Sequence, residues 1–170
     1  AWAVAFRVGF IGTLLWVGRA VFIDFLLLGV SIATVTSIVA NKLLISGRRS
    51  QQTGTAANLA LVNRVEWQYA FDVFLNSYVP VFVVIHVFQY FLLVFPFTFT
   101  HGFFGALISA ILYMYAWSHY SYITLLGFEA LGFVKGAVAF LYPLFVVFFG
   151  LLVLILFKVN FTALVIGSYL

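Results

Sequence analysis

The sequence predicts an all-α fold: a polytopic helical membrane bundle with four complete transmembrane helices and the end of an earlier one. First, 66% of the residues are hydrophobic and only 12 of 170 are charged, 8 Lys or Arg and 4 Asp or Glu, whereas roughly a quarter is usual in soluble domains. Second, no Asp, Glu, Lys or Arg occurs between Asp72 and Glu129. Third, runs such as 140–157 are apolar on every face. Such runs favour helices, because the strands of a membrane barrel alternate apolar and polar residues.

The first elements follow from this pattern. The chain begins without Met inside an apolar segment. We therefore expect residues 1–10 to be the end of an earlier span in a truncated chain, followed by a turn near Arg7 and Gly9. The first complete span is predicted over about residues 13–40, a length of roughly 42 Å. Because the hydrocarbon core is only ~30 Å thick, this helix must tilt or protrude, with Arg19 reaching towards the nearer interface.

The remainder is predicted as one transmembrane domain covering residues 1–170. A hydrophilic loop follows at about 41–71, since its middle is rich in Ser, Gln, Thr and Gly. Further spans are expected at about 72–96, 103–126 and 137–157. A second loop lies at 127–136, and a short tail follows Lys158.

Basic residues give an orientation. The two loops carry five of the eight Lys and Arg residues, and the opposite side carries three. Cytosolic loops of membrane proteins are enriched in Lys and Arg. We therefore expect both loops in the cytosol and the C-terminus in the lumen.

Polar residues inside the predicted spans are the candidate functional groups, because they are costly in lipid and usually face a protein interior. They are predicted to form an intramembrane polar network: Asp24, Asp72, Asn76, His86, Gln89 and His119. At 100° per residue, Asp72, Asn76 and His86 share one stripe. Asp24 and His86 each lie about 16 Å from the same membrane face, so they can meet as a buried pair. That pair is either structural, contributing roughly 0.6–2 kcal/mol, or a proton or ligand site.

Each other candidate has a structural alternative. Asp72 can stabilise the first turn of its helix, where the dipole favours an acid. His119 is expected to be a satisfied interhelical histidine. The Asn160-Phe161-Thr162 sequon is expected to lie too close to the membrane for modification.

No enzyme chemistry is recognisable in the residue pattern. The chain has no cysteine, and its three histidines lack metal-ligand spacing. No nucleophile–base pair, phosphate-binding glycine loop or catalytic carboxylate pair occurs. We therefore predict no catalytic residue, no metal and no cofactor.

A second candidate surface lies at the predicted cytosolic boundary. Its residues are expected to contact anionic lipid or a cytosolic partner: Lys42, Arg48, Arg49, Arg64, Glu66, Trp67 and Tyr69. Nucleic acid is disfavoured as a partner, because a net charge of +4 in a membrane chain indicates a cytosolic loop.

The segment VEWQYAFDVFLNSYVP, residues 65–80, resembles a hallmark of the Unc-fifty family of Golgi membrane proteins. The matching residues are Glu66, Trp67, Tyr69, Phe71, Asp72, Asn76 and Pro80. Phe74 occupies the position where the family usually has histidine. Asp24, the Asn41-Lys42 pair, His86 and Gln89 also match in order and spacing, whereas Gly132 replaces a proline and Ser109-Ala110 replaces Gly-Asn.

This resemblance implies five spans, residence in Golgi or early secretory membranes, and no known catalytic reaction. It also implies a role in vesicular trafficking of membrane proteins with Arf guanine-nucleotide exchange factors and cargo receptors. Our leading hypothesis is a non-enzymatic trafficking scaffold whose loop 41–71 faces a cytosolic partner. The alternatives are a small proton-coupled carrier using the intramembrane Asp and His residues, and a structural subunit of a membrane complex. The oligomeric state does not follow from the sequence.

Overall fold

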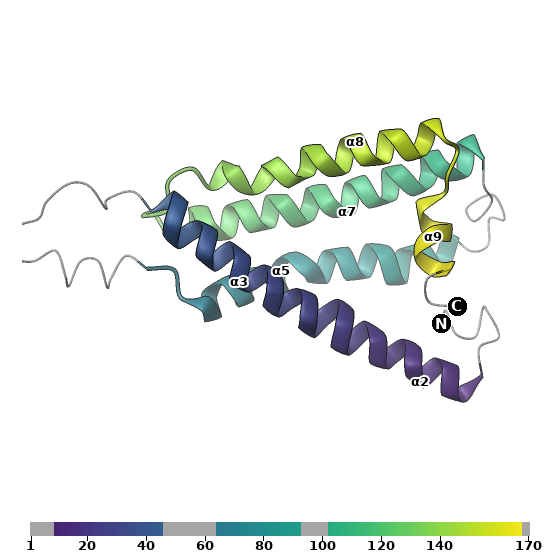
Figure 1. Ribbon diagram of the computed structural model, residues 1–170, viewed down its shortest axis with the longest axis horizontal. Helices are drawn as coiled ribbons and strands as arrows, with labels where there is room; N and C mark the ends of the chain where they lie inside the picture. The colour runs from purple at the N-terminus through teal and green to yellow at the C-terminus, as the bar shows by residue number, and fades with distance from the viewer. Residues whose placement is uncertain (1–8, 46–63, 93–101, 168–170) are drawn as a thin grey trace, which may run out of the picture.

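The computed structural model describes residues 9–45, 64–92 and 102–167. These parts of the chain are helical and contain no β-strand beyond one isolated bridge between Ile45 and Val134. The predicted all-α class is confirmed. Figure 1 shows long helices lying side by side, with the first one crossing the others obliquely.

The first helix is continuous from Phe10 to Leu44 and contains four consecutive parts. These are α2 (Phe10–Arg19), the π-helical η1 (Ala20–Leu27), α3 (Leu28–Val39) and the π-helical η2 (Ala40–Leu44). Its 35 residues extend about 52 Å, well beyond a ~30 Å hydrocarbon core. The backbone becomes extended at Ile45.

The second long helix is built from α5 (Trp67–Phe82), the π-helical η3 (Val83–Phe88) and α6 (Gln89–Phe91). It begins at Trp67, five residues before the predicted start of the span. Asp72 therefore lies in the second turn, and the first turn contains no acid. The interpretation of Asp72 as a first-turn dipole partner is wrong. Pro80 lies inside α5, where it has no N–H to donate to the carbonyl of Asn76.

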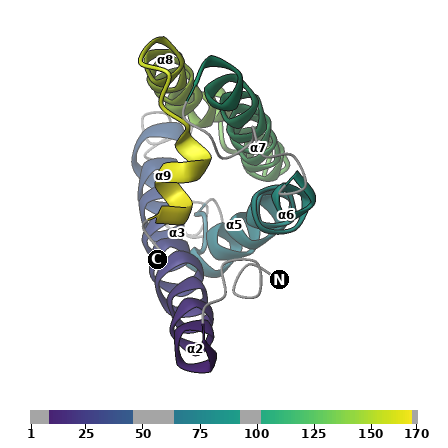
Figure 2. The same cartoon turned by 90° about the vertical axis from the view of Figure 1, so that its right-hand side faces the viewer.

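The third helix is α7 (Phe103–Glu129). A turn with left-handed backbone at Gly132 (φ 61°) and Gly136 (φ 86°) leads to a 3-10 turn, η6 (Ala137–Leu141), and to α8 (Tyr142–Leu156). The residues after Lys158 form a further helix, α9 (Phe161–Gly167), where the sequence predicted only a short tail. Figure 2 shows α9 folded back across one end of the bundle.

Helix packing places α7 at the centre of the bundle. It contacts α5 on one side and α8 on the other, and α3 packs on α5. Small buried residues, Gly29, Ala33 and Ser37, recur every four residues along α3 and allow this close approach.

Three helices are long and apolar enough to cross a membrane: Phe10–Leu44, Trp67–Phe88 and Ala137–Leu156. Four complete spans were predicted. Helix α7, with 27 residues, is long enough to cross a membrane. It is not among these three because its Tyr, Ser, Trp and His side chains lower its mean hydropathy. In the most apolar stretch of each of these three helices, only 17%, 17% and 6% of the residues are buried. Their side chains therefore mostly face outward, as lipid contact requires. The predicted end of an earlier span lies almost entirely outside the described residues.

Candidate functional site

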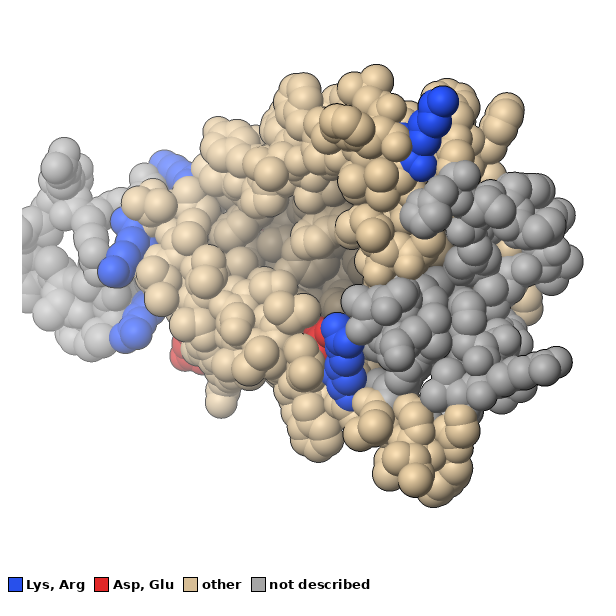
Figure 3. Space-filling view, turned by 45° about the vertical axis from the view of Figure 1, so that its right-hand side comes forward, with Lys and Arg blue, Asp and Glu red and all other residues tan. Residues whose placement is uncertain are grey.

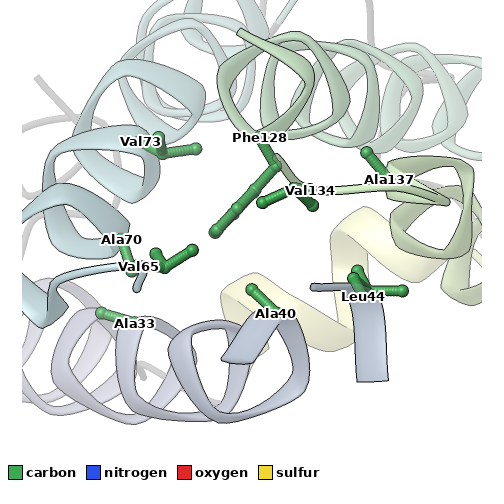
Figure 4. Close-up of a cluster of buried hydrophobic side chains, with 9 residues drawn as sticks. All are labelled: Ala33, Ala40, Leu44, Val65, Ala70, Val73, Phe128, Val134 and Ala137. Atoms are coloured by element: carbon green, nitrogen blue, oxygen red, sulfur yellow. The ribbon is translucent and has the colours of Figure 1, made fainter. Parts of the chain in front are cut away.

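The end of the bundle that carries the two predicted loops, here named the loop end, has an apolar core. It is formed by Ala33, Ala40, Leu44, Val65, Ala70, Val73, Phe128, Val134 and Ala137. Figure 4 shows the ring of Phe128 pointing into the middle of this cluster. Phe128 is 0% exposed and stacks on Phe140 at 4.4 Å between ring centroids. The ring of Phe128 from α7 thus contacts a cluster that includes residues of the first helix, α5 and the turn that leads to α8.

Hydrogen bonds between segments far apart in sequence fix the same end. The side chain of Asn41 pairs with the backbone of Val65: Nδ2 donates to the carbonyl at 2.8 Å, and Oδ1 accepts from the N–H at 2.9 Å. The N–H of Lys135 donates to the carbonyl of Leu44 at 2.7 Å. The chain on both sides of residues 46–63, and the turn after α7, are therefore held together.

The predicted partner-contact residues are arranged on the outside of this core. Lys42, Arg64, Glu66 and Trp67 are exposed and Tyr69 is half-buried. Lys135, which was not among the predicted contacts, is also exposed at this end. Figure 3 shows basic side chains gathered at the loop end. Arg48 and Arg49 lie outside the described residues.

Trp67 and Tyr69 are also tied to the bundle. The indole Nε1 of Trp67 donates to Thr34 Oγ1 at 3.1 Å, while 41% of the residue stays exposed. The hydroxyl of Tyr69 donates to the carbonyl of Gly127. These two aromatic residues connect the start of α5 to the first helix and to α7.

A series of aromatic rings runs along α5 and η3 on the side that faces the first helix. Neighbouring ring centroids are 4.6–6.4 Å apart, in the order Trp67, Phe71, Phe74, Tyr78, Phe82 and His86. Phe25 of the first helix contacts both Phe74 and Tyr78. Phe74 is buried against the bare backbone of Gly29, where a Cβ atom would lie 2.6 Å from its Cε1. Phe74, at the position where the resemblance led us to expect histidine, is thus a packing residue.

The predicted polar network is divided into separate groups. Asp24 and His86 come close enough for electrostatic attraction, and Asp24 also attracts Arg19. Both Asp24 and His86 lie in π-helical segments. Asp72 and Asn76 instead lie on the side of α5 next to α7, with Asn76 Nδ2 3.4 Å from Asp72 Oδ2.

The π-helical segment η3 gives the physical reason for this division. The predicted stripe assumed 100° per residue along the whole helix. A π-helical turn contains more residues, so each residue turns the chain by less. His86 therefore stays in line with the aromatic rings that face the first helix, rather than with Asp72 and Asn76.

His119 joins neither group. Its ring lies 6.2 Å from that of Tyr115, and its Nδ1 is buried without a hydrogen-bond partner among the described residues. The interhelical hydrogen bond expected for this histidine is not seen at Nδ1. Within the described parts of the chain, no three His, Asp or Glu side chains are placed to hold a metal ion.

Asp72 and Asn76 line an open cavity of about 270 Å³ between α5 and α7. Its other lining residues are Tyr69, Val73, Ile123, Leu126 and Gly127. Gly127 lets the two helices approach closely, because a Cβ atom there would lie 2.8 Å from Val73. The cavity lies beside this contact, near the loop end.

The opposite end of the bundle, here named the far end, contains a buried polar cluster of which only Gln89 was among the predicted network residues. Gln89, Ser109, Asn160 and Thr162 are all at most 1% exposed. Thr162 accepts a hydrogen bond from the side chain of Gln89. Its N–H donates to Ser109 Oγ at 2.9 Å, and the two hydroxyls are 3.1 Å apart. The sequence feature that could have predicted this cluster is the polar pair Asn160 and Thr162 directly before the apolar residues 163–166.

A bundle with three membrane-length apolar helices and outward-facing apolar side chains defines an integral membrane protein of the all-helical class. Comparison with known proteins then gives its family. The chain belongs to the UNC-50 family, whose model matches residues 1–170.

Relatives in distant organisms are similar to the chain. It is 37% identical over 150 residues to "Protein unc-50 homolog" of Dictyostelium discoideum, covering 88% of this chain and 54% of that protein. It is 38% identical over 130 residues to the human "Protein unc-50 homolog", covering 76% of this chain and 44% of that protein. A "Protein GMH1 homolog" of Schizosaccharomyces pombe is 35% identical to it over 123 residues, covering 72% of this chain and 49% of that protein. The chain spans about half the length of these relatives, and no solved structure matches it.

Proposed function

We propose that this chain is the membrane-embedded part of a non-enzymatic trafficking scaffold of Golgi or early secretory membranes. Its loop end faces the cytosol and docks an Arf guanine-nucleotide exchange factor. The observation that carries this proposal is the way the loop end is built. A buried apolar core and the Asn41–Val65 and Lys135–Leu44 hydrogen bonds hold charged and aromatic side chains outward in fixed positions.

The charge of the loop end supports a cytosolic orientation. Lys42, Arg64 and Lys135 are exposed there, and Arg48 and Arg49 belong to the segment that joins Ile45 to Arg64. Short loops rich in Lys and Arg remain in the cytosol. Lys158 is the one described basic residue that follows α8, at the far end.

We further propose that α7 also crosses the membrane, which brings the number of spans in the described residues to four. Its 27 residues extend about 40 Å, enough for the hydrocarbon core. It lies alongside α5 and α8, each part of an apolar helix of membrane length. Because its neighbours cover much of its surface, its Tyr, Ser and His side chains need less contact with lipid. Four crossings then place both loops in the cytosol and the C-terminus in the lumen.

The test is binding of an Arf exchange factor to the full chain in nanodiscs. The triple variant K42A/R64A/K135A removes the exposed charges of the loop end, and K158A removes one at the far end as the matched control. We expect the triple variant to weaken binding about tenfold or more, as loss of several charged contacts does, and K158A to leave it unchanged. Equal binding by all three proteins would remove the loop end from the mechanism.

A second candidate function is favoured by one observation. Asp24 and His86 attract each other, and both lie in π-helical segments, which are frequent at functional sites. The pair is suited to move a proton in a small carrier. In proteoliposomes, a carrier would show acid-driven proton uptake that Asp24→Asn abolishes and Glu129→Gln preserves. Uptake at the level of protein-free vesicles would leave the pair with a structural role.

A further inference from the structure

We propose that the cavity between α5 and α7 binds the primary ammonium group of a membrane lipid, with Asp72 as its counter-ion. This site is separate from the exposed charges that the docking proposal uses, and it goes beyond that function.

The first argument is the state of Asp72. The residue is exposed, within a helix apolar enough to cross a membrane. In the described part of the chain it has no cationic partner, and its hydrogen-bond partner there is Asn76 Nδ2 at 3.4 Å. A carboxylate so placed is costly unless it is paired. A ligand that brings a positive charge removes this cost.

The second argument is the set of polar groups in the cavity. An ionised carboxylate only accepts hydrogen bonds, and an ammonium group only donates them, up to three. Asn76 also lines the cavity, and its side-chain oxygen can accept a hydrogen bond while Nδ2 faces Asp72. Acceptors of this kind favour a primary ammonium over a quaternary one, which has no N–H.

The third argument is shape and depth. A volume of about 270 Å³ is close to the lower limit for small-molecule sites, so the cavity accommodates a headgroup but not a helix. Asp72 lies five residues from Trp67, about 7.5 Å further along the helix. If Trp67 marks the interface, as tryptophan commonly does, the carboxylate lies just inside it.

The fourth argument is the apolar part of the lining. Val73, Ile123 and Leu126 line the same cavity as Asp72 and Asn76. Val73 closes against Gly127, while Leu126 is exposed. An ammonium group attached to an acyl chain matches this combination. Two lipid sources share that chemistry: the headgroup of phosphatidylethanolamine, and the amine of a sphingoid base.

The experiment uses the full chain in nanodiscs that contain a photoreactive lipid with the diazirine in its acyl chain. Three probes are compared in separate samples: phosphatidylethanolamine, sphingosine, and phosphatidylcholine as the quaternary control. Labelled peptides are mapped by mass spectrometry. We expect phosphatidylethanolamine or sphingosine, or both, to label residues 69–76 and 123–127 more than phosphatidylcholine does, and the stronger probe identifies the source.

Asp72→Asn keeps the shape of the side chain and removes its charge. We expect it to lower labelling by the primary-amine lipid roughly tenfold, the loss that follows from removing one charge-assisted hydrogen bond. Glu129→Gln, an exposed acid at the same end that does not line the cavity, is the matched control. The thermal unfolding midpoint of each variant shows whether the bundle is intact.

Two results would overturn the proposal. The first is equal labelling of residues 69–76 and 123–127 by all three probes, and the second is unchanged labelling of Asp72→Asn.

Discussion

The two ends of the bundle are held together in different ways. At the loop end the interior is apolar, with Phe128 at its centre, and the charged side chains lie outside. At the far end the interior contains a polar cluster around Thr162, and α9 is held in place through it. In lipid, apolar burial adds little driving force and close packing with interhelical hydrogen bonds contributes more. The loop end thus has an apolar interior and a charged exterior, as soluble domains do, whereas the far end is held by buried interhelical hydrogen bonds, as membrane bundles are.

The largest effect is expected from removing the ring at the centre of the loop end. Phe128→Ala leaves a cavity among residues of three helices, and such changes cost about 3–5 kcal/mol. We expect a large fall in the free energy of unfolding, measured by thermal denaturation in detergent. Phe149→Ala is the control, because Phe149 is 62% exposed and faces outward. Equal destabilisation by the two variants would contradict the described core.

A smaller effect is expected where the first helix meets α5. In Gly29→Ala the new methyl group collides with the ring of Phe74, and overpacking of this kind costs about 1–3 kcal/mol. Gly150→Ala is the control, since nothing lies within 4 Å of its Cβ position. Adding Phe74→Leu to Gly29→Ala should restore part of the lost stability. No restoration in the double variant would show that the two helices do not meet at these residues.

The far end is expected to respond to loss of a single hydroxyl. Thr162→Val removes the acceptor for Gln89 and one contact to Ser109, and leaves the amide of Gln89 buried without this partner. The cost of such an unsatisfied group is about 1–3 kcal/mol. We expect faster hydrogen exchange in α9 with little change in α3. Thr36→Val is the control, because the Thr36 hydroxyl bonds within its own helix. Uniform exchange changes across both helices would contradict a local role.

The smallest effect concerns the sequon. Asn160 is 0% exposed, and its side chain accepts a hydrogen bond from the N–H of Ala163 at 3.3 Å, as a helix cap does. We expect no glycan at this position, so enzymatic deglycosylation should leave the mobility of the protein unchanged. A mobility shift that Asn160→Gln abolishes would show that this end of the chain opens.

Sequence reasoning recognised the helices because only helices and closed barrels span lipid, and runs that are apolar on every face do not alternate as barrel strands do. It missed what depends on tertiary contacts. The start of α5 at Trp67 is stabilised by bonds from Trp67 and Tyr69 to other helices. Helix α9 is short and held by the polar cluster, so its sequence gives little signal.

The candidate site was predicted in part. Equal depth predicted that Asp24 and His86 can meet, because depth depends only on rise per residue, and the two residues lie near enough to interact electrostatically. Uniform helical spacing placed Asp72 and Asn76 on the same stripe as His86, and the π-helical segment η3 separates them. The packing face formed by Gly29, Ala33 and Ser37 was not predicted, because a helix that is apolar on all sides has no polar face to show which side packs against the protein.

The most direct measurement is labelling of single cysteines in sealed vesicles, because the chain has no cysteine of its own. The positions are Arg64→Cys and Lys135→Cys at the loop end, and Phe103→Cys and Lys158→Cys at the far end. All four residues are exposed. With a membrane-impermeant maleimide added from the cytosolic side, the account predicts that the first two react at once. The last two should react only after permeabilisation. Reaction of Phe103→Cys and Lys135→Cys from the same side would show that α7 does not cross the membrane, and would contradict the account.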